Sequence, residues 1–170
     1  MTDQHPFEMR QPDQDYFKGV LLTVVGQAFS AADYELAHEP FQWLSGRYRF
    51  VKALDDAWHA YIEFQVLVYT DNAYAAGMPS RFRVTLIRSD RAGGKASPHE
   101  HYAKRTLSEL VVGDFGVAIL PSADHWWSFH DTTSLGNALA EAGHLVVGYG
   151  MPWLQGDLSP DSVPPALDKD

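Results

Sequence analysis

Strict alternation of apolar and polar residues is the feature that most constrains the fold of this chain. Residues 58–69 (WHAYIEFQVLVY) place apolar side chains at every even position from Trp58 to Val68. Residues 81–87 (RFRVTLI) and residues 47–54 (RYRFVKAL) alternate in the same way. A period of two is typical of antiparallel strands that pack one face on a core. The three segments therefore predict an antiparallel sheet.

An apolar segment before these strands predicts a helix. Residues 16–32 (YFKGVLLTVVGQAFSAA) are apolar on most sides, which favours a buried helix over a surface one. Asp13 or Asp15 can cap it, since acids suit the N-terminus of a helix. The β-branched residues in the segment leave a strand as the alternative.

The C-terminal part predicts an amphipathic helix that starts near Asp131 or Thr132 and stops at Met151–Pro152. Its apolar positions are spaced four, three, four and three residues apart, which forms one stripe at about 100° per residue. Glycines on one flank of the stripe lower helix propensity and indicate close backbone packing. The stripe consists of Leu135, Leu139, Ala142, Val146 and Tyr149, and the glycines are Gly136, Gly143 and Gly150.

These elements predict an α+β fold, in which an antiparallel sheet of about four strands is covered on one face by the N- and C-terminal helices. Residues 111–121 (VVGDFGVAILP) supply the fourth strand, after a long polar loop over residues 88–104. Residues 1–12 form a flexible arm, residues 13–156 a single domain, and residues 157–170, with three prolines, a disordered tail.

Composition excludes several classes of function. A net charge of −9 disfavours nucleic-acid binding, which needs a basic surface. The absence of cysteine excludes thiol catalysis and cysteine metal sites. The longest apolar run is about half the ~20 residues of a membrane span, and the N-terminus lacks a signal pattern, so a cytoplasmic protein is expected. No motif for nucleophilic catalysis or for nucleotide phosphates is present.

Three histidines form the candidate metal site. His99 and His101 flank a glutamate in SPHEHYAKR, and His125 follows in ILPSADHWW. His-x-His can direct two imidazoles to one divalent transition metal, and His125 would be a third ligand. Residues 93–101 resemble the first motif of cupin barrels (G-x5-H-x-H), and residues 116–125 resemble the second. The expected glutamate is missing, however, and the sequence favours a solvent-exposed loop with no cofactor.

Arginines on the polar face of the predicted sheet form the candidate anion site. Paired guanidinium hydrogen bonds suit carboxylate and phosphate groups. The alternative is cross-strand ion pairing with Glu63 on a solvated face. The side chains are Arg47, Arg49, Arg81 and Arg83, with Arg88 as a further member.

The tryptophans near the C-terminus form the candidate interaction surface. Exposed tryptophans mark a binding patch, whereas buried ones extend a core. The residues are Trp126, Trp127 and Trp153.

The C-terminal pattern WWSFHDTTSLGNALAEAGHLVVGYGMPWL, together with the strands EFQ and RFRVTL, resembles an uncharacterised family of small bacterial domains. The resemblance spans residues 15–156 and implies a fold type and a bacterial origin, without an activity. We therefore expect a non-enzymatic binding or interaction module, with a protein partner or a second copy of the chain, for instance one that neutralises a basic protein. A metal-binding protein or metal-dependent enzyme and an anion-binding module are the alternatives.

Overall fold

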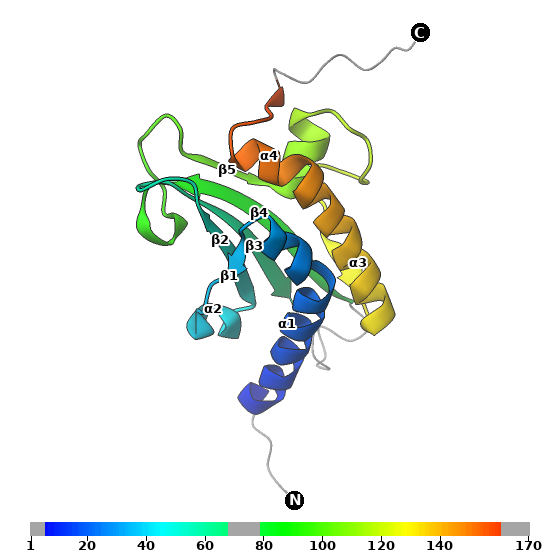
Figure 1. The fold of residues 1–170 in the computed structure, drawn as a ribbon. Helices are drawn as coiled ribbons and strands as arrows, with labels where there is room; N and C mark the ends of the chain where they lie inside the picture. Colours follow the sequence, from blue (N-terminus) through cyan, green and yellow to red (C-terminus); the bar gives the residue numbers. More distant parts are fainter. Residues whose placement is uncertain (1–5, 68–78, 161–170) are drawn as a thin grey trace, which may run out of the picture.

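The chain folds into an antiparallel sheet and a layer of helices that covers one face of it (Figure 1). The computed structural model describes residues 6–67 and 79–160. The helices are α1 (Pro6–Ala31), α2 (Pro40–Leu44), α3 (Thr132–Leu145) and α4 (Met151–Leu154), with further helical segments η1 (Ala92–Gly94), η2 (Glu109–Asp114) and η3 (Val146–Gly150). The strands are β1 (Glu35–Leu36), β2 (Arg47–Ala53), β3 (His59–Leu67), β4 (Ser80–Ser89), β5 (Ala103–Thr106) and β6 (Trp127–Phe129).

The sheet confirms the antiparallel prediction and holds six strands among the described residues, rather than about four. The order is β1-β2-β3-β4-β5, and β6 pairs with the part of β4 that β5 leaves free. The register places Ile62 opposite Leu86 and Phe64 opposite Val84, which joins the apolar faces of β3 and β4. The additional strands are two to four residues long, too short to show a period of their own.

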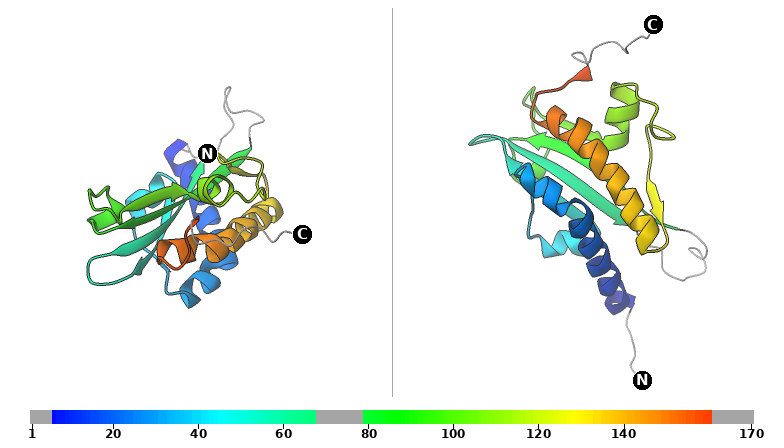
Figure 2. Two further views of the ribbon diagram at one scale, coloured as in Figure 1. Left: turned by 90° about the horizontal axis from the view of Figure 1, so that it is seen from above. Right: turned by 45° about the vertical axis from the view of Figure 1, so that its right-hand side comes forward.

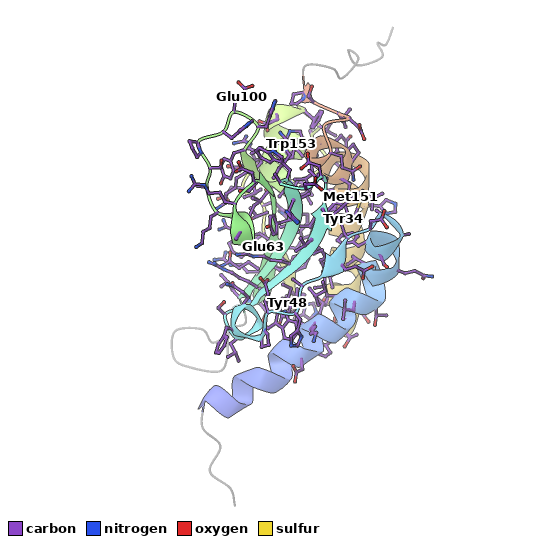
Figure 3. The ribbon with its side chains drawn as sticks, turned by 60° about the vertical axis from the view of Figure 1, so that its left-hand side comes forward. Tyr34, Tyr48, Glu63, Glu100, Met151 and Trp153 are labelled. Atoms are coloured by element: carbon purple, nitrogen blue, oxygen red, sulfur yellow. The ribbon has the colours of Figure 1, made fainter. Side chains whose placement is uncertain are left out.

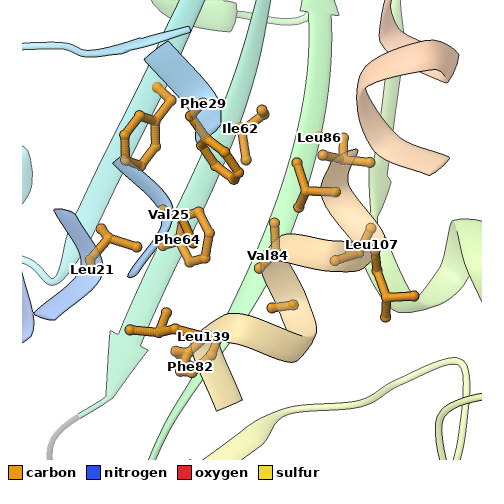
Figure 4. Packing of buried hydrophobic residues seen from close by; sticks show 14 of the residues in the cluster. Leu21, Val25, Phe29, Ile62, Phe64, Phe82, Val84, Leu86, Leu107 and Leu139 are labelled. Carbon is orange, nitrogen blue, oxygen red and sulfur yellow. The ribbon is translucent and has the colours of Figure 1, made fainter. Parts of the chain in front are cut away.

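Helix α1 lies across the inner face of the sheet beside α3 (Figure 2). Its buried side chains recur every fourth residue and pack on β3 and β4 (Figure 4). Leu22, on the other side, is 39% exposed, so α1 is a surface helix with one apolar stripe. No helix within residues 6–67 or 79–160 combines the length and apolarity needed to cross a bilayer. The buried stripe is Phe17, Leu21, Val25 and Phe29.

The bounds of the N-terminal helix differ from the predicted ones. Helix α1 begins at Pro6, so residues 6–12 are helical where an arm was expected. Proline suits the first helical position, because the N–H that it lacks has no partner there. Residues 1–5 and, at the other end, residues 161–170 of the predicted tail lie outside the described residues.

Helix α3 starts where the sequence predicts. The Asp131 carboxylate accepts the Ser134 N–H at 2.8 Å, and Ser134 Oγ accepts the Asp131 N–H at 3.1 Å, which completes a capping box. The predicted stop at Met151–Pro152 is wrong, because the chain continues through η3 into α4 and remains helical to Leu154. Pro152 lies in the first turn of α4, where it needs no N–H.

The predicted strand over residues 111–121 is also wrong. The segment begins as the helical turn η2, which ends at Asp114. Thr106 and Glu109 cap it reciprocally, since each backbone N–H donates to the other's side-chain oxygen, at 2.9 and 3.1 Å. This T-x-x-E capping box lies just before the apolar residues and turns them into a helix.

Close packing occurs at two of the three glycines that the sequence places beside the apolar stripe. A Cβ atom on Gly143 would lie 2.9 Å from Val25 Cγ1 of α1, and one on Gly150 would lie 3.2 Å from Leu86 Cδ1 of β4. In the described part of the chain, nothing lies within 4 Å of the same point on Gly136. Gly143 therefore sets the distance between the two long helices.

We expect opposite effects from adding a methyl group at two of these positions. Gly143→Ala should lower the free energy of unfolding by about 1–3 kcal/mol, because it forces α1 and α3 apart. Gly136→Ala should raise it by about 0.5–1 kcal/mol, because alanine favours an open helical site. Urea unfolding of both variants measures the difference. Shifts of the same sign would show that Gly143 does not control the packing.

Candidate functional site: the arginine face of the sheet

The sheet face opposite the helices carries the arginines that the sequence predicts. The register places Arg47, Gln65 and Arg83 in one row across β2, β3 and β4. Arg81 precedes Arg83 by two residues on β4, so both side chains project from the same face. Arg49 occupies the corresponding position in the next row of β2. We call Arg47, Arg49, Arg81 and Arg83 the arginine face.

One end of the arginine face is neutralised within the protein. Arg49 Nε donates to Glu63 Oε1 at 3.1 Å, and the two side chains are only 13% and 10% exposed. Figure 3 labels Glu63 in β3. Arg49 Nη1 also donates to the carbonyl of Gly93 in η1. The neighbouring Gly94 lies against the ring of Tyr61. Here the loop after β4 covers the sheet, and the charges pair as the ion-pair alternative predicts.

The other end of the face holds two arginines on one indole ring. Strand β6 places Trp127 opposite Phe82, which brings the preceding residue, Trp126, beside Arg83. The Cζ atoms of Arg81 and Arg83 lie 4.7 and 4.8 Å from the Trp126 ring centroid. Cation–π contacts are worth about 0.5–1 kcal/mol at exposed sites. The indole therefore holds both guanidinium groups in place.

In the described part of the chain, these two arginines form no ion pair. No described carboxylate lies within the 4.0 Å of an ion pair with Arg81 or Arg83. Their Nε atoms are buried, and no described group forms a hydrogen bond with them. The pKa of Glu109 is lowered chiefly by the hydrogen bond from the Thr106 N–H, and the charge of Arg83 contributes a smaller lowering. Two cations thus lie side by side with no ion-paired carboxylate among the described residues.

Arg88 does not belong to the arginine face, contrary to the prediction. Its even position places it on the same side of β4 as Phe82 and Leu86, toward the helices. Its Nε donates to the His101 carbonyl at 2.9 Å, and its Nη1 donates to the last carbonyls of α4 at 3.1 Å. It holds the end of α4 against the sheet.

The structure does not bring the three predicted metal ligands together. His99 and His101 are exposed, with ring centroids 5.2 Å apart, and both rings meet Trp58 edge-on. The His125 ring instead packs on Trp127 at 4.7 Å, where burial lowers its pKa. Among the residues that the structure describes, no group of three or more His, Cys, Asp or Glu could hold a metal ion.

The predicted interaction tryptophans have three different environments. Trp127 is buried, and its Nε1 donates to Glu141 at 2.7 Å. Trp153 is half-buried, with its ring centroid 5.9 Å from the Arg88 Cζ. Trp126 is half-buried on the arginine face. The structure therefore joins one residue of the predicted interaction set to the predicted anion set.

The contact between Trp126 and the arginines is not evident from the sequence. It depends on the pairing of β6 with β4, and β6 is only three residues long. The alternation Trp127-Ser128-Phe129 is the one hint of a strand there. The chemistry of this site has to be interpreted from its own residues, since no protein-family model, curated protein or solved structure matches the chain.

Proposed function

We propose that the protein is a non-enzymatic binding module and that its arginine face holds a carboxylate-bearing segment of a protein partner at Arg81 and Arg83. The observation that supports this function is the pair of guanidinium groups on Trp126, neither of which forms an ion pair with an acid among the described residues. A carboxylate of the partner would supply the missing negative charge.

The chemistry of the guanidinium group favours a carboxylate. Its planar fork offers two parallel N–H donors, which match the two oxygens of a carboxylate. The stacking on Trp126 restrains both side chains, so less rotamer freedom is lost when an anion binds. Gln65 and Arg47, in the same row as Arg83, extend the polar surface across the strands.

The negative charge of the whole chain limits the attraction of an anion to the immediate surroundings of Arg81 and Arg83. At a net charge of −9, the protein repels acidic molecules from most directions. Charges on its surface are screened beyond a Debye length of about 8 Å at physiological ionic strength. An acidic partner is therefore attracted only where it reaches Arg81 and Arg83 directly. The expectation of a basic protein partner on the acidic surface stays a prediction, and the same experiment distinguishes it from an acidic partner.

Calorimetric titration with hexaglutamate and hexalysine tests the proposal. Wild-type protein should bind hexaglutamate and not hexalysine. Arg81→Gln/Arg83→Gln should weaken binding by about tenfold or more, because a hydrogen bond to a charged group contributes about 1.5–3 kcal/mol.

Arg91→Gln/Lys95→Gln is the matched control. It removes the same charge from two exposed positions outside the arginine face and should leave binding within about twofold of wild type. Equal losses in both double variants would reduce the effect to net charge and overturn the assignment. Binding of hexalysine alone would favour a basic partner instead.

A further inference from the structure

A second site lies at the end of the sheet where Arg88 meets the C-terminus of α4. A pocket of about 420 Å³ opens there, within the range of about 300–1,000 Å³ common for small-molecule sites. It is built from the β2–β3 turn, the end of β4, the loop before β5 and the end of α4, and none of its lining residues belongs to the arginine face. The lining includes Leu54, Asp55, Trp58, Arg88, Leu154 and Gln155.

Arg88 gives this pocket a fixed positive charge. Its Nε and Nη1 atoms are engaged by the carbonyls of His101, Trp153 and Leu154. Burial lowers its pKa, but a guanidinium remains protonated in proteins. In the described part of the chain, no carboxylate pairs with Arg88 and no group accepts from its Nη2.

Asp55 gives the same pocket a fixed negative charge. Its Oδ1 accepts the N–H groups of Ala57 and Trp58, at 2.9 and 2.8 Å. These two bonds lower the pKa of the carboxyl group, which keeps it ionised at neutral pH. Within residues 6–67 and 79–160, no donor engages Oδ2.

The two charges line one pocket, yet they do not form an ion pair with each other in the described structure. Backbone groups hold each of them in place, Arg88 at the end of α4 and Asp55 in its turn. Opposite charges that line one open pocket without pairing match a ligand that carries both charges itself. The apolar part of the wall comes from Leu54, Trp58 and Leu154, and His101 and Gln155 add polar side chains.

We propose that this pocket binds a small zwitterion, an α-amino acid with an apolar side chain. Its carboxylate would accept from Arg88 Nη2, its ammonium group would donate to Asp55 Oδ2, and its side chain would lie on Trp58. Each charged group would then have a partner of opposite charge. This ligand differs from the acidic segment proposed for the arginine face, so either assignment can fail alone.

The test is a titration of the full chain with L-phenylalanine, L-leucine and glycine, followed by calorimetry and by the indole Nε1–H resonance of Trp58. Wild-type protein should bind phenylalanine or leucine more tightly than glycine. Phenethylamine, which lacks the carboxylate, and phenylpropionate, which lacks the ammonium group, should each bind at least about tenfold more weakly than phenylalanine.

Asp55→Asn is the decisive variant, because its amide oxygen keeps the acceptor that the turn needs while the charge is removed. It should weaken phenylalanine binding by about tenfold or more. Asp56→Asn, its exposed neighbour outside the pocket lining, makes the same change in net charge and should bind like wild type. Equal binding by the two variants, or the absence of saturable binding of all three amino acids to wild type, would overturn the proposal.

Discussion

Replacing Phe82 by alanine is expected to lower the free energy of unfolding by about 3–5 kcal/mol, the cost of removing a large aromatic side chain from a packed core. Phe82 has no exposed surface and lies at the centre of the core. Its ring centroid is 5.5 Å from that of Trp127 and 5.9–6.3 Å from those of Phe17, Phe64 and Phe129. The cavity would therefore open between α1, β3, β4 and β6 at once.

Urea unfolding measures this loss, and Phe41→Ala is its control. Phe41 lies on α2 and is 85% exposed, so its truncation should change stability by no more than about 0.5 kcal/mol. Similar losses in the two variants would show that Phe82 is not the centre of the core.

Replacing Arg49 by methionine is expected to cost about 3–5 kcal/mol, the usual penalty for removing one partner of a buried ion pair. The variant would leave the Glu63 carboxylate 10% exposed beneath the loop after β4, without its guanidinium partner. The effect should come from the uncompensated charge rather than from lost packing, since methionine fills similar space.

The double variant Arg49→Met/Glu63→Leu separates these two causes. With both charges removed, stability should return to within about 1 kcal/mol of wild type, because apolar replacements of a buried pair are often neutral. Chemical denaturation of wild type, the two single variants and the double variant gives the coupling energy. A double variant as unstable as Arg49→Met would assign the loss to packing.

The sequence predicts those helices and strands in which a regular apolar pattern repeats over many residues. Strands β3 and β4 alternate over many residues, and α3 has both a regular apolar stripe and a capping residue, Asp131. The N-terminal segment was ambiguous between helix and strand because its composition suits both. Its buried residues, every fourth from Phe17 to Phe29, decide for a helix once they have a sheet to cover.

Other elements are determined by local features that leave no regular apolar pattern. The residues after Thr106 resemble a strand in composition, but the capping box between Thr106 and Glu109 makes them helical. The outer face of the sheet is less open than the alternation of polar residues indicates. Tyr61, Glu63 and Ile87 are each under 10% exposed, and Gly94 of the following loop packs against Tyr61 and Ile87.

The candidate site also has a part that the sequence predicts and a part that only the structure shows. The odd positions of four arginines predict a shared face, and the even position of Arg88 would have excluded it. The position of Trp126 beside the arginines and the pocket at Asp55 both result from contacts between segments that are distant in the sequence. A single sequence does not show such contacts. Local patterns, namely apolar periodicity and capping residues, determine the helices and strands. The candidate sites are formed only when these elements pack together.

The central claim, that Arg81 and Arg83 form an anion-binding site on Trp126, is tested most directly by heteronuclear NMR. The Arg Nε–H and Trp indole Nε1–H resonances are followed while hexaglutamate is added to the full chain. We predict saturable shifts of Arg81, Arg83 and Trp126 with a common dissociation constant, while Trp153 stays unchanged. Shifts confined to other resonances, or none at saturating peptide, would contradict the account.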